Sequence, residues 1–401
     1  MSALRVLHII PAVAARYGGP SRAIFEMCRA LASHGAEVLI ATTDADGHGH
    51  LAVDKEIVID YQGARTIFFR NGWNERFNYS APLARWLDDN VKRFDVAHIH
   101  AVFSHPCIAA AIACRKSGVP YIVRPLGSLD PWSMKQKRMR KLLMWRAGAG
   151  RMLREAAAIH YTTADERRLA EASLALDNGV VIPLGIETDN LQGRGVKELF
   201  RPRQASLGDR PYLLTLSRVH PKKNIELLIE AFLALAAEPE FDEWRLVIAG
   251  DGEAAYIDSL KLMADKSGGR GRVIFSGWLD GDERVAALAG AELLALTSHQ
   301  ENFGLAAAEA LACGVPVIVS TGVNLAREIE AAGAGWVVSL DCRSLSSALR
   351  EALAGEQERK RRGRAGRELA ARQFCWQKLS ADLIDLYARV AGRSAEMSSA
   401  V

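Results

Sequence analysis

Segment 298–320 carries two glutamates placed on either side of a predicted anion site. It reads SHQENFGLAAAEALACGVPVIVS, a polar turn with Glu301, a run of strong helix formers that contains Glu309, and then a strand. The first backbone N–H groups of a helix have no partner within it and attract an anion, usually a phosphate. Here they belong to Phe303, Gly304 and Leu305. Because carboxylates suit sugar and ribose hydroxyls rather than phosphates, the segment predicts a nucleotide-sugar site.

Two cations follow another predicted strand, YLLTLSR. Arg218 ends this strand, and Lys223 begins the next helix. The carboxyl ends of parallel strands meet at one edge of a sheet, so we expect both cations beside segment 298–320. Fixed cations stabilise the charge that develops on a leaving diphosphate, and they do so without a metal ion. Alone, the two residues fit ordinary surface cations better, but Glu301, Glu309 and the helix start together favour a catalytic site.

Strands and helices alternate twice along the 401 residues, which predicts two Rossmann-like α/β domains. We expect an N-terminal acceptor domain at 1–190 and a C-terminal donor domain at 211–372. Between them, at 191–210, the periodicity disappears and Gly, Arg and Gln accumulate, as in a linker. A final segment, 373–401, begins with an amphipathic helix.

The candidate ligand residues of the first domain lie at predicted strand ends. The first strand feeds a loop that contains Gly18 and Gly19, and a helix follows. The loop lacks G-x-G-x-x-G, so the two glycines indicate only a close approach to the backbone or a positive φ. His100 and Arg124 end later strands, where open α/β sheets bind ligands. A structural, hydrogen-bonded role for the histidine is equally consistent.

The loop TDADGHGH imitates a metal site. It alternates acids and histidines, namely Asp44, Asp46, His48 and His50. A glycine-rich loop gives no rigid ligand geometry, and the sequence shows no residues that would orient the ligands. We therefore interpret it as a solvated turn and expect no metal in this protein.

Residues 132–154 favour an anionic partner. The segment is rich in Lys and Arg, has no acid, and interleaves Met, Leu and Trp. A basic amphipathic helix of this kind suits an anionic membrane surface or a phosphorylated acceptor. The alternative is an ordinary surface helix that happens to be basic.

Composition excludes several classes of protein. The net charge of +4 is too small to indicate nucleic-acid binding, and no apolar run is long enough to span a bilayer. The 6 cysteines are scattered without a C-x-x-C, which favours reduced core thiols in a cytoplasmic protein. The N-terminus resembles a signal peptide, but His8 and Pro11 interrupt its apolar run and favour a first strand.

SRVHPKKN followed by ENFGLAAAEALACGVPVIVS resembles glycosyltransferase family 4, the retaining enzymes of GT-B fold. The resemblance extends over nearly the whole chain and includes the glycine loop, the AGDGE turn at 249–253 and the closing Phe/Trp segment. It implies an α/β GT-B fold, with two Rossmann-like domains facing a central cleft. It also implies a C-terminal helix that crosses back to the N-terminal domain.

The resemblance implies roles for individual residues. Glu301 would contact the donor sugar, Glu309 the ribose, Arg218 and Lys223 the diphosphate, and Gly18 and Gly19 would close over the phosphates. The implied reaction moves a sugar with retained anomeric configuration, while the leaving phosphate assists the incoming hydroxyl. The donor would be a UDP- or GDP-sugar, with no metal or other cofactor.

Two positions depart from the family pattern. Asn302 replaces the Gly of the usual Glu-Gly-Phe-Gly, next to the donor sugar. Leu126 stands where many relatives have His, before the glycine of RPLG. Either another group such as His100 or Arg124 serves in its place, or the activity is altered.

We therefore expect a retaining hexosyltransferase of surface-polysaccharide assembly. It would act on a glycan or polyprenyl-linked acceptor in the cytoplasm, peripherally on the inner face of the membrane. One alternative is a nucleotide-sugar epimerase of GT-B fold, against which the Arg/Lys and paired-Glu pattern argues. The other is a non-catalytic nucleotide-sugar-binding partner subunit, which Leu126 leaves open.

Overall fold

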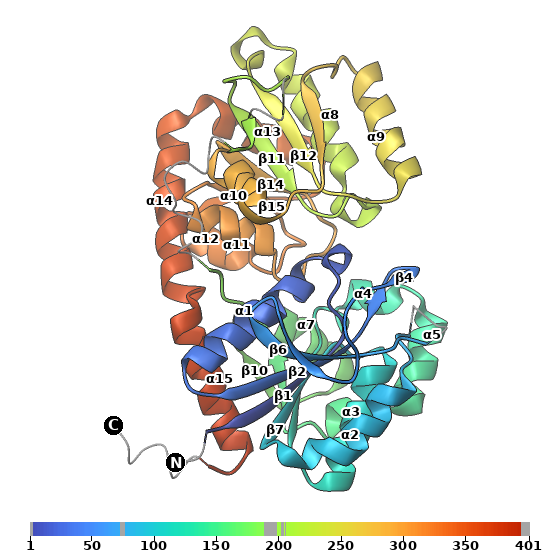
Figure 1. Ribbon diagram of the computed structural model, residues 1–401. Helices are drawn as coiled ribbons and strands as arrows, with labels where there is room; N and C mark the ends of the chain where they lie inside the picture. The colour runs from blue at the N-terminus through green and yellow to red at the C-terminus, as the bar shows by residue number, and fades with distance from the viewer. Residues whose placement is uncertain (1–2, 73–76, 188–198, 202–203, 205, 394–401) are drawn as a thin grey trace. The chain divides into compact units, whose positions relative to one another are not determined.

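The protein divides into two compact α/β units, shown in the computed structural model of Figure 1. The structure describes residues 3–72, 77–187, 199–201, 204 and 206–393. The first unit joins Met1–Gly185 to Trp376–Val401, and the second is Ile186–Cys375. Each contains its own sheet, so the predicted pair of Rossmann-like domains is confirmed. Most of the predicted linker at 191–210 lies outside the described residues.

The first unit is built on an eight-stranded sheet in the order β10-β9-β8-β7-β1-β2-β6-β5. Its strands are β1 (Arg5–Ala12), β2 (Glu37–Thr43), β5 (Val58–Tyr61), β6 (Ala64–Phe69), β7 (Val96–His100), β8 (Tyr121–Arg124), β9 (Ala158–Tyr161) and β10 (Gly179–Val181). Only the edge pair β5–β6 is antiparallel. Along the chain, the strands up to β6 extend the sheet on one side of β1, and the strands from β7 onward extend it on the other side. The topological switch point therefore lies between β1 and β7.

Helices cover both faces of this sheet. They are α1 (Gly19–Ser33), α2 (Ala81–Asn90), α3 (His105–Ser117), α4 (Pro131–Lys135), α5 (Arg138–Met144), α6 (Gly150–Arg154), α7 (Ala164–Leu174) and α15 (Trp376–Val390). α15 packs against α1, and the Trp376 indole donates to Glu26 at 3.3 Å. The predicted return of the C-terminal helix to the N-terminal domain is thus confirmed.

The basic segment is not the single helix that its composition predicts. α4 ends at Lys135, and Lys137 adopts a left-handed conformation with φ 50°. After α5, a π-helical turn at Trp145–Ala149 contains Gly148 with φ 143°, and α6 follows. Periodicity cannot reveal these breaks, because they depend on single backbone angles rather than on the apolar pattern.

The second unit contains a six-stranded parallel sheet in the order β13-β12-β11-β14-β15-β16. Its strands are β11 (Tyr212–Leu216), β12 (Arg245–Ala249), β13 (Val273–Gly277), β14 (Leu293–Leu296), β15 (Val317–Ser320) and β16 (Gly335–Val338). Its helices are α8 (Ile225–Ala236), α9 (Ala254–Lys266), α10 (Gly281–Ala289), α11 (Leu305–Ala312), α12 (Ala326–Ala331), α13 (Cys342–Ala354) and α14 (Glu356–Gln373). Here the switch point lies between β11 and β14, which begin the two halves of the sheet.

A chain of hydrogen-bonded rings crosses the α15 face of the first sheet. The His160 Nε2 donates to the Ile182 carbonyl at 2.8 Å, so a neutral His160 accepts at Nδ1 from the His98 Nε2, 3.3 Å away. The His98 Nδ1 is then left to accept from the hydroxyl of Tyr387 on α15, at 2.7 Å. The hydrogen bonds therefore fix a neutral tautomer for both histidines and join α15 to the sheet.

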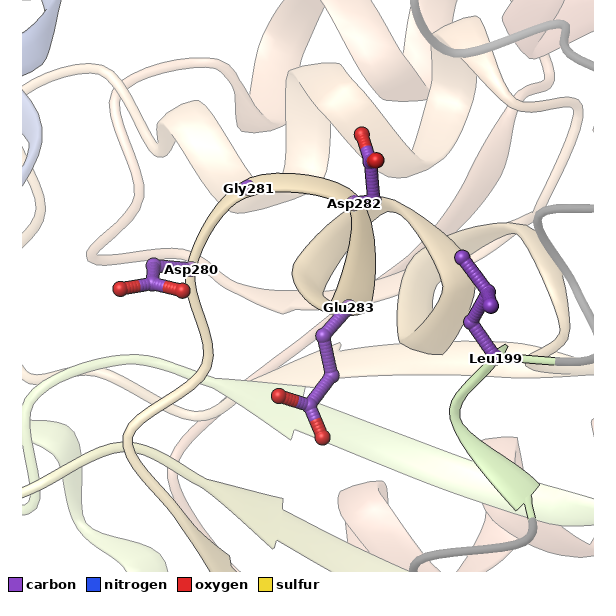
Figure 2. Close-up of a pocket in the computed structure, with 5 residues that line it drawn as sticks. All are labelled: Leu199, Asp280, Gly281, Asp282 and Glu283. Atoms are coloured by element: carbon purple, nitrogen blue, oxygen red, sulfur yellow. The ribbon is translucent and has the colours of Figure 1, made fainter.

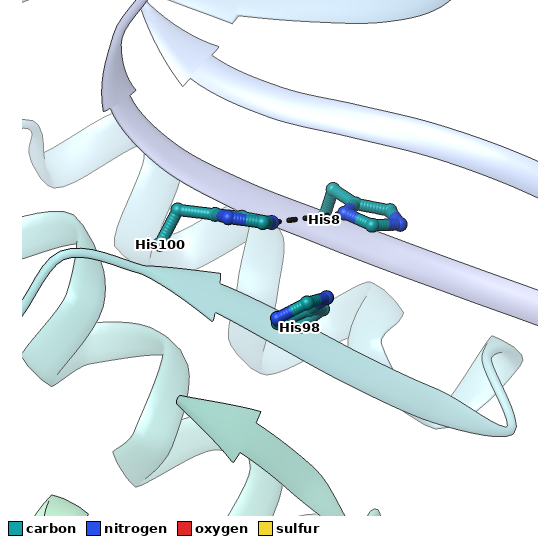
Figure 3. A group of neighbouring side chains, drawn as sticks. All are labelled: His8, His98 and His100. Atoms are coloured by element: carbon teal, nitrogen blue, oxygen red, sulfur yellow. Dashed lines mark hydrogen bonds between the residues drawn. The ribbon is translucent and has the colours of Figure 1, made fainter. Parts of the chain in front are cut away.

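A second histidine pair adjoins this chain at the switch point. The His8 Nδ1 lies 2.9 Å from the His100 Nε2, as Figure 3 shows. Nitrogens of His8, His98 and His100 lie within 4.8 Å of one another. Both nitrogens of His98 are already engaged, however, and the positive charge of Arg124 acts on the cluster. These contacts favour a hydrogen-bonded network over a metal site.

The network predicts that the first unit loses stability in mild acid. Burial, with help from Arg124, lowers the pKa of His8 from 6.5 to about 3, and that of His160 to about 3. Below pH 6.5, therefore, these histidines bind protons in the unfolded chain but stay neutral in the folded unit. As the pH falls below 6.5, each such histidine lowers the free energy of unfolding by about 1.4 kcal/mol per pH unit.

Hydrogen exchange of the β1 and β7 amides, corrected for intrinsic rates, measures this loss in urea at pH 7.5 and pH 5.5. The protection should be lower at pH 5.5 than at pH 7.5, and His8→Gln/His160→Gln should reduce this difference. The exposed His48 supplies a matched control, since His48→Gln should leave it unchanged. Equal stability at both pH values in the wild type would contradict the neutral network.

Candidate functional site

The predicted donor residues of the second unit gather at its switch point. Arg218 follows β11, and Lys223 ends a 3-10 turn at Pro221–Lys223, just before α8. Glu301 follows β14, the neighbouring strand, and precedes α11. The carboxyl ends of β11 and β14 thus bring together charges that are far apart in the sequence.

Backbone contacts hold the two strand-end loops together. The His299 N–H donates to the Lys222 carbonyl at 2.9 Å. The Thr297 hydroxyl lies 3.1 Å from the carbonyls of both Lys223 and Asn224. The loop that carries Glu301 is therefore fixed to the turn that carries Lys223, independently of their side chains.

Two glycines of the AGDGE turn let a third strand end approach the same place. A Cβ on Gly250 would lie 1.8 Å from the Ser217 carbonyl oxygen, and one on Gly252 would lie 2.0 Å from that of Val219. The Val219 N–H in turn donates to the Asp251 carbonyl at 2.8 Å. Only glycine permits this contact, which fixes the backbone on both sides of Arg218.

Lys223 and Glu301 form an ion pair at the centre of this group. Their side chains are 14% and 23% exposed, so water screens the pair only partly. Burial would raise the pKa of the Glu301 carboxyl, but Lys223, with Lys222 and Arg218, lowers it below its ordinary value. Glu301 is therefore a carboxylate at neutral pH, surrounded by three cations.

The start of α11 has the geometry that an anion site requires. Gly304 caps the helix in a left-handed conformation, φ 85°, which favours glycine. The Phe303 ring is buried and lies edge-on to Phe374, with centroids 5.4 Å apart. Among the described residues, the N–H groups of Phe303, Gly304 and Leu305 have no protein acceptor. These groups are positioned to bind an anion next to Glu301.

Glu309 lies in the middle of α11 and is 4% exposed. Its carboxylate pairs with Arg284 on the neighbouring helix α10. Arg284 could not be predicted from the sequence, because only the packing of α10 on α11 brings it to Glu309. The pair holds the carboxylate that the resemblance assigns to the ribose.

Buried polar atoms around Glu301 add residues that the sequence analysis missed. Gln300 and Asn324 are 4% and 6% exposed, and among the described residues their Nε2 and Nδ2 have no hydrogen-bond partner. The Asn324 N–H donates to the Glu301 carbonyl at 3.0 Å. Asn302, which replaces the usual glycine, is partly exposed in the same loop. Buried amide groups without protein partners are candidates for ligand contacts.

The predicted residues of the first unit lie at the switch point of that unit. Gly18 caps α1 with φ 82°, and Gly19 is the first residue of the helix. His100 and Arg124 end adjacent strands and are paired in register, but they are only 1% and 2% exposed. Leu126, where relatives often have His, is partly exposed and has φ 55°. A residue other than glycine is strained in that backbone conformation, as residues at functional sites often are.

The interpretation of the Asp/His loop as a solvated turn is wrong for Asp44. This residue is 1% exposed and accepts from the Asn71 N–H at 2.6 Å. His50 and Lys55 lie 3.0 and 3.6 Å from its two carboxylate oxygens. Asp44 therefore anchors the loop, while His48 and His50 are exposed.

A hollow of about 310 Å³ lies beside the start of α10 and is separate from these residues. It is lined by Leu199, Asp280, Gly281, Asp282 and Glu283, drawn in Figure 2. Three of the five are acids, which repel phosphate. The hollow therefore suits the diphosphate less well than the start of α11 does.

Comparisons with known proteins agree with this geometry. Residues 18–185 match the family model "Glycosyl transferase 4-like domain", and residues 196–369 match "Glycosyl transferases group 1". A D-inositol 3-phosphate glycosyltransferase of Xylanimonas cellulosilytica is 29% identical over 54% of this chain and 53% of its own length. A GDP-mannose-dependent alpha-(1-6)-phosphatidylinositol monomannoside mannosyltransferase of Mycobacterium tuberculosis is 30% identical over 51% of this chain and 54% of its own length. The chain thus spans about half the length of these relatives.

Solved structures support the fold. The Anabaena HepE structure in complex with UDP and glucose has a TM-score of 0.77 and 17% identity, over 96% of this chain and 100% of that one. Sucrose-phosphate synthase of Thermosynechococcus elongatus has a TM-score of 0.75 and 20% identity, over 96% of this chain and 99% of that one. At this level of identity the likeness shows the GT-B fold alone.

The Arg284–Glu309 pair predicts a stability effect that is separable from binding. Arg284→Ala removes a cation from a buried carboxylate, which should lower the free energy of unfolding by about 3 kcal/mol. Urea unfolding measures the loss. As a matched control, Arg361 forms an ion pair with Glu358 but is 52% exposed, so water screens the pair and Arg361→Ala should cost far less stability. Equal effects of the two substitutions would contradict the structural role of the buried pair.

Proposed function

This chain belongs to the GT4-type glycosyltransferases of GT-B fold, and from that premise we propose that it moves a sugar from a nucleotide-diphosphate sugar to a hydroxyl. The acceptor would be a glycan or a lipid-linked glycan. One observation carries the proposal, namely the meeting of Lys223, Glu301 and the start of α11 at one switch point. That group offers cations and N–H donors to a diphosphate and a carboxylate to a sugar.

In this proposal donor binding separates the ion pair. The structure pairs Lys223 with Glu301. A diphosphate carries more negative charge than one carboxylate, so it draws Lys223 and the neighbouring Arg218 towards its oxygens. Glu301 is then free to accept hydrogen bonds from hydroxyls of the donor sugar. The side-chain NH2 groups of Gln300 and Asn324, which have no hydrogen-bond partner among the described residues, are suited to donate to other sugar oxygens.

The remaining donor contacts follow from α11. Its first N–H groups, from Phe303 to Leu305, are proposed to bind phosphate oxygens, which the helix dipole favours. Glu309 is proposed to accept from a ribose hydroxyl while it stays paired with Arg284. A contact of Gly18 and Gly19 with the phosphates stays a prediction of the family resemblance.

The chemistry breaks the bond between the anomeric carbon and a phosphate oxygen. The acceptor hydroxyl forms the new bond on the same face of the sugar, and its proton passes to the departing phosphate. This route retains the anomeric configuration. Lys223 and Arg218 stabilise the negative charge that accumulates on the diphosphate, so the proposed reaction needs no metal ion.

The relatives suggest which acceptors to test first. The names of the two curated relatives above refer to an inositol phosphate and a phosphatidylinositol mannoside. No helix in the described part of this chain combines the length and apolar content that crossing a membrane requires. We propose a peripheral enzyme on the cytoplasmic face of the membrane, acting in surface or exopolysaccharide assembly.

The proposal predicts slow hydrolysis of one UDP- or GDP-sugar by the purified chain, and faster turnover with an inositol phosphate, a phosphatidylinositol mannoside or a polyprenyl-linked acceptor. Arg218→Ala and Glu301→Ala should each reduce the rate by about 100-fold or more, because each removes a charge that contacts the reacting donor. A chelator should leave the rate unchanged. Arg343→Ala, an exposed arginine on α13, serves as the control.

Other outcomes favour the alternative functions. Formation of an epimeric sugar nucleotide without transfer would indicate an epimerase. Tight donor binding with no turnover under any acceptor would indicate a non-catalytic subunit, and would overturn the proposal.

A further inference from the structure

Arg124 of the first unit is a buried cation whose hydrogen bonds are incomplete. Two arginines of the described residues are buried, Arg124 at 2% exposed and Arg359, in the second unit, at 8%. The Arg359 Nη1 donates to the carbonyls of Ala352 and Leu353 at 2.7 and 2.9 Å, and its Nη2 lies 3.5 Å from Glu292. The Arg124 Nε and Nη2, by contrast, are buried without a hydrogen-bond partner among the described residues. Buried donors without acceptors are costly, so they indicate a ligand that supplies the acceptors.

The acid that acts most strongly on Arg124 is engaged elsewhere. This acid is Glu166 on α7, whose charge raises the pKa of Arg124. Its Oε1 accepts from the Gly127 N–H at 2.8 Å, and its Oε2 accepts from the N–H and the hydroxyl of Thr162, both at 2.8 Å. Burial lowers the pKa of Arg124 to about 10, so the guanidinium is still a cation at neutral pH.

The histidine network beside Arg124 does not balance its charge. Burial, with help from the charge of Arg124, lowers the pKa of His8, His98, His100 and His160. The four rings are therefore neutral at pH 7. The network contributes no negative charge to the end of β8, where Arg124 lies.

The backbone turns directly after Arg124. This residue ends β8, at the carboxyl edge of the sheet, where open α/β sheets bind ligands. Leu126 and Gly127 follow with left-handed φ values of 55° and 70°, and the Gly127 N–H is held by Glu166. Glu166 thus fixes the turn rather than the guanidinium, and the turn keeps Leu126 in a conformation that is costly for a residue other than glycine.

We propose that Arg124 binds an oxyanion of the acceptor, a phosphate or a carboxylate, and so selects acceptors that carry one. The Nε and Nη2 of an arginine form one edge of the guanidinium, whose two parallel N–H groups match two oxygens of either anion. These are the two Arg124 nitrogens that are buried without a partner among the described residues. The inference rests on the proposed transfer reaction, and it adds the chemical class of the acceptor and the residue that recognises it.

Transfer to matched acceptors, with the donor that the chain hydrolyses, tests the proposal. One pair is inositol phosphate and inositol, and the other is a glycan that ends in glucuronate and the same glycan ending in glucose. The wild type should use the anionic member of at least one pair with a kcat/KM about 10- to 100-fold higher, as expected for hydrogen bonds to a charged group. The pair that shows the preference distinguishes phosphate from carboxylate.

Variants separate this contact from a structural role. Arg124→Met should remove most of the preference, mainly by raising the KM of the anionic acceptor. Arg124→Lys should keep part of it, because it retains the charge and loses the paired donors, and it serves as the test if Arg124→Met does not fold. The matched control is Arg359→Met, which removes the other buried arginine and should leave the preference unchanged. A variant that is only destabilised loses rate with both members of a pair.

Two results would overturn the proposal, namely transfer by the wild type without preference in either pair, and a wild-type preference in both Arg124 variants. Absence of hydrolysis and transfer with every donor would contradict the proposed function instead. Calorimetric titration of inositol phosphate and of glucuronate without donor then tests Arg124 directly. The wild type should bind one of them, and Arg124→Met should bind it about tenfold more weakly. Binding that Lys223→Met loses and Arg124→Met keeps would place the anion at the donor site and overturn the proposal.

Discussion

The ion pair between Lys223 and Glu301 is the interaction around which the candidate site is organised. It joins the ends of β11 and β14, the two strands from which the second sheet grows in opposite directions. The backbone bonds from His299 and Thr297 hold the two loops in place, so the pair does not carry their geometry alone. Three cations keep Glu301 ionised, which leaves a carboxylate ready for hydroxyls once an anion takes Lys223. In the proposed function, the diphosphate of the donor binds Lys223 and the sugar binds Glu301, so donor binding separates the pair.

The first unit uses its switch point differently. There the strand ends carry His100 and Arg124, both buried, and a histidine network that continues to Tyr387 of α15. The network makes the C-terminal helix part of the first unit at neutral pH. The more exposed features of that unit are the glycine loop at Gly18 and the helix α5, on which Met139 and Leu143 are 77% and 69% exposed. In the proposed function the second unit binds the donor, and the first unit is left for the acceptor.

The sequence was sufficient where the apolar pattern was strong. Alternating runs of strand and helix length predicted both sheets, and the order of strand, loop and helix placed Arg218, Lys223 and Glu301 at one edge. The sequence was insufficient where tertiary packing determines which side chains are paired or buried. Arg284 reaches Glu309 only because α10 packs on α11, and Asp44 is buried only because Asn71, His50 and Lys55 converge on it. The basic segment misled for another reason, since the turns at Lys137 and Gly148 depend on backbone angles that composition does not encode.

The most direct test of the donor site is calorimetric titration of UDP and GDP into the full chain. The account predicts that one of them binds, that Lys223→Met weakens its binding by about tenfold or more, and that Glu301→Gln does not weaken it, because the competing carboxylate is gone. The double variant Lys223→Met/Glu301→Gln, which leaves no unpaired charge, should bind as weakly as Lys223→Met and shows that the loss is not caused by misfolding. If neither nucleotide binds the wild type, or if both lysine variants bind as tightly as it does, the ion pair is not a diphosphate site.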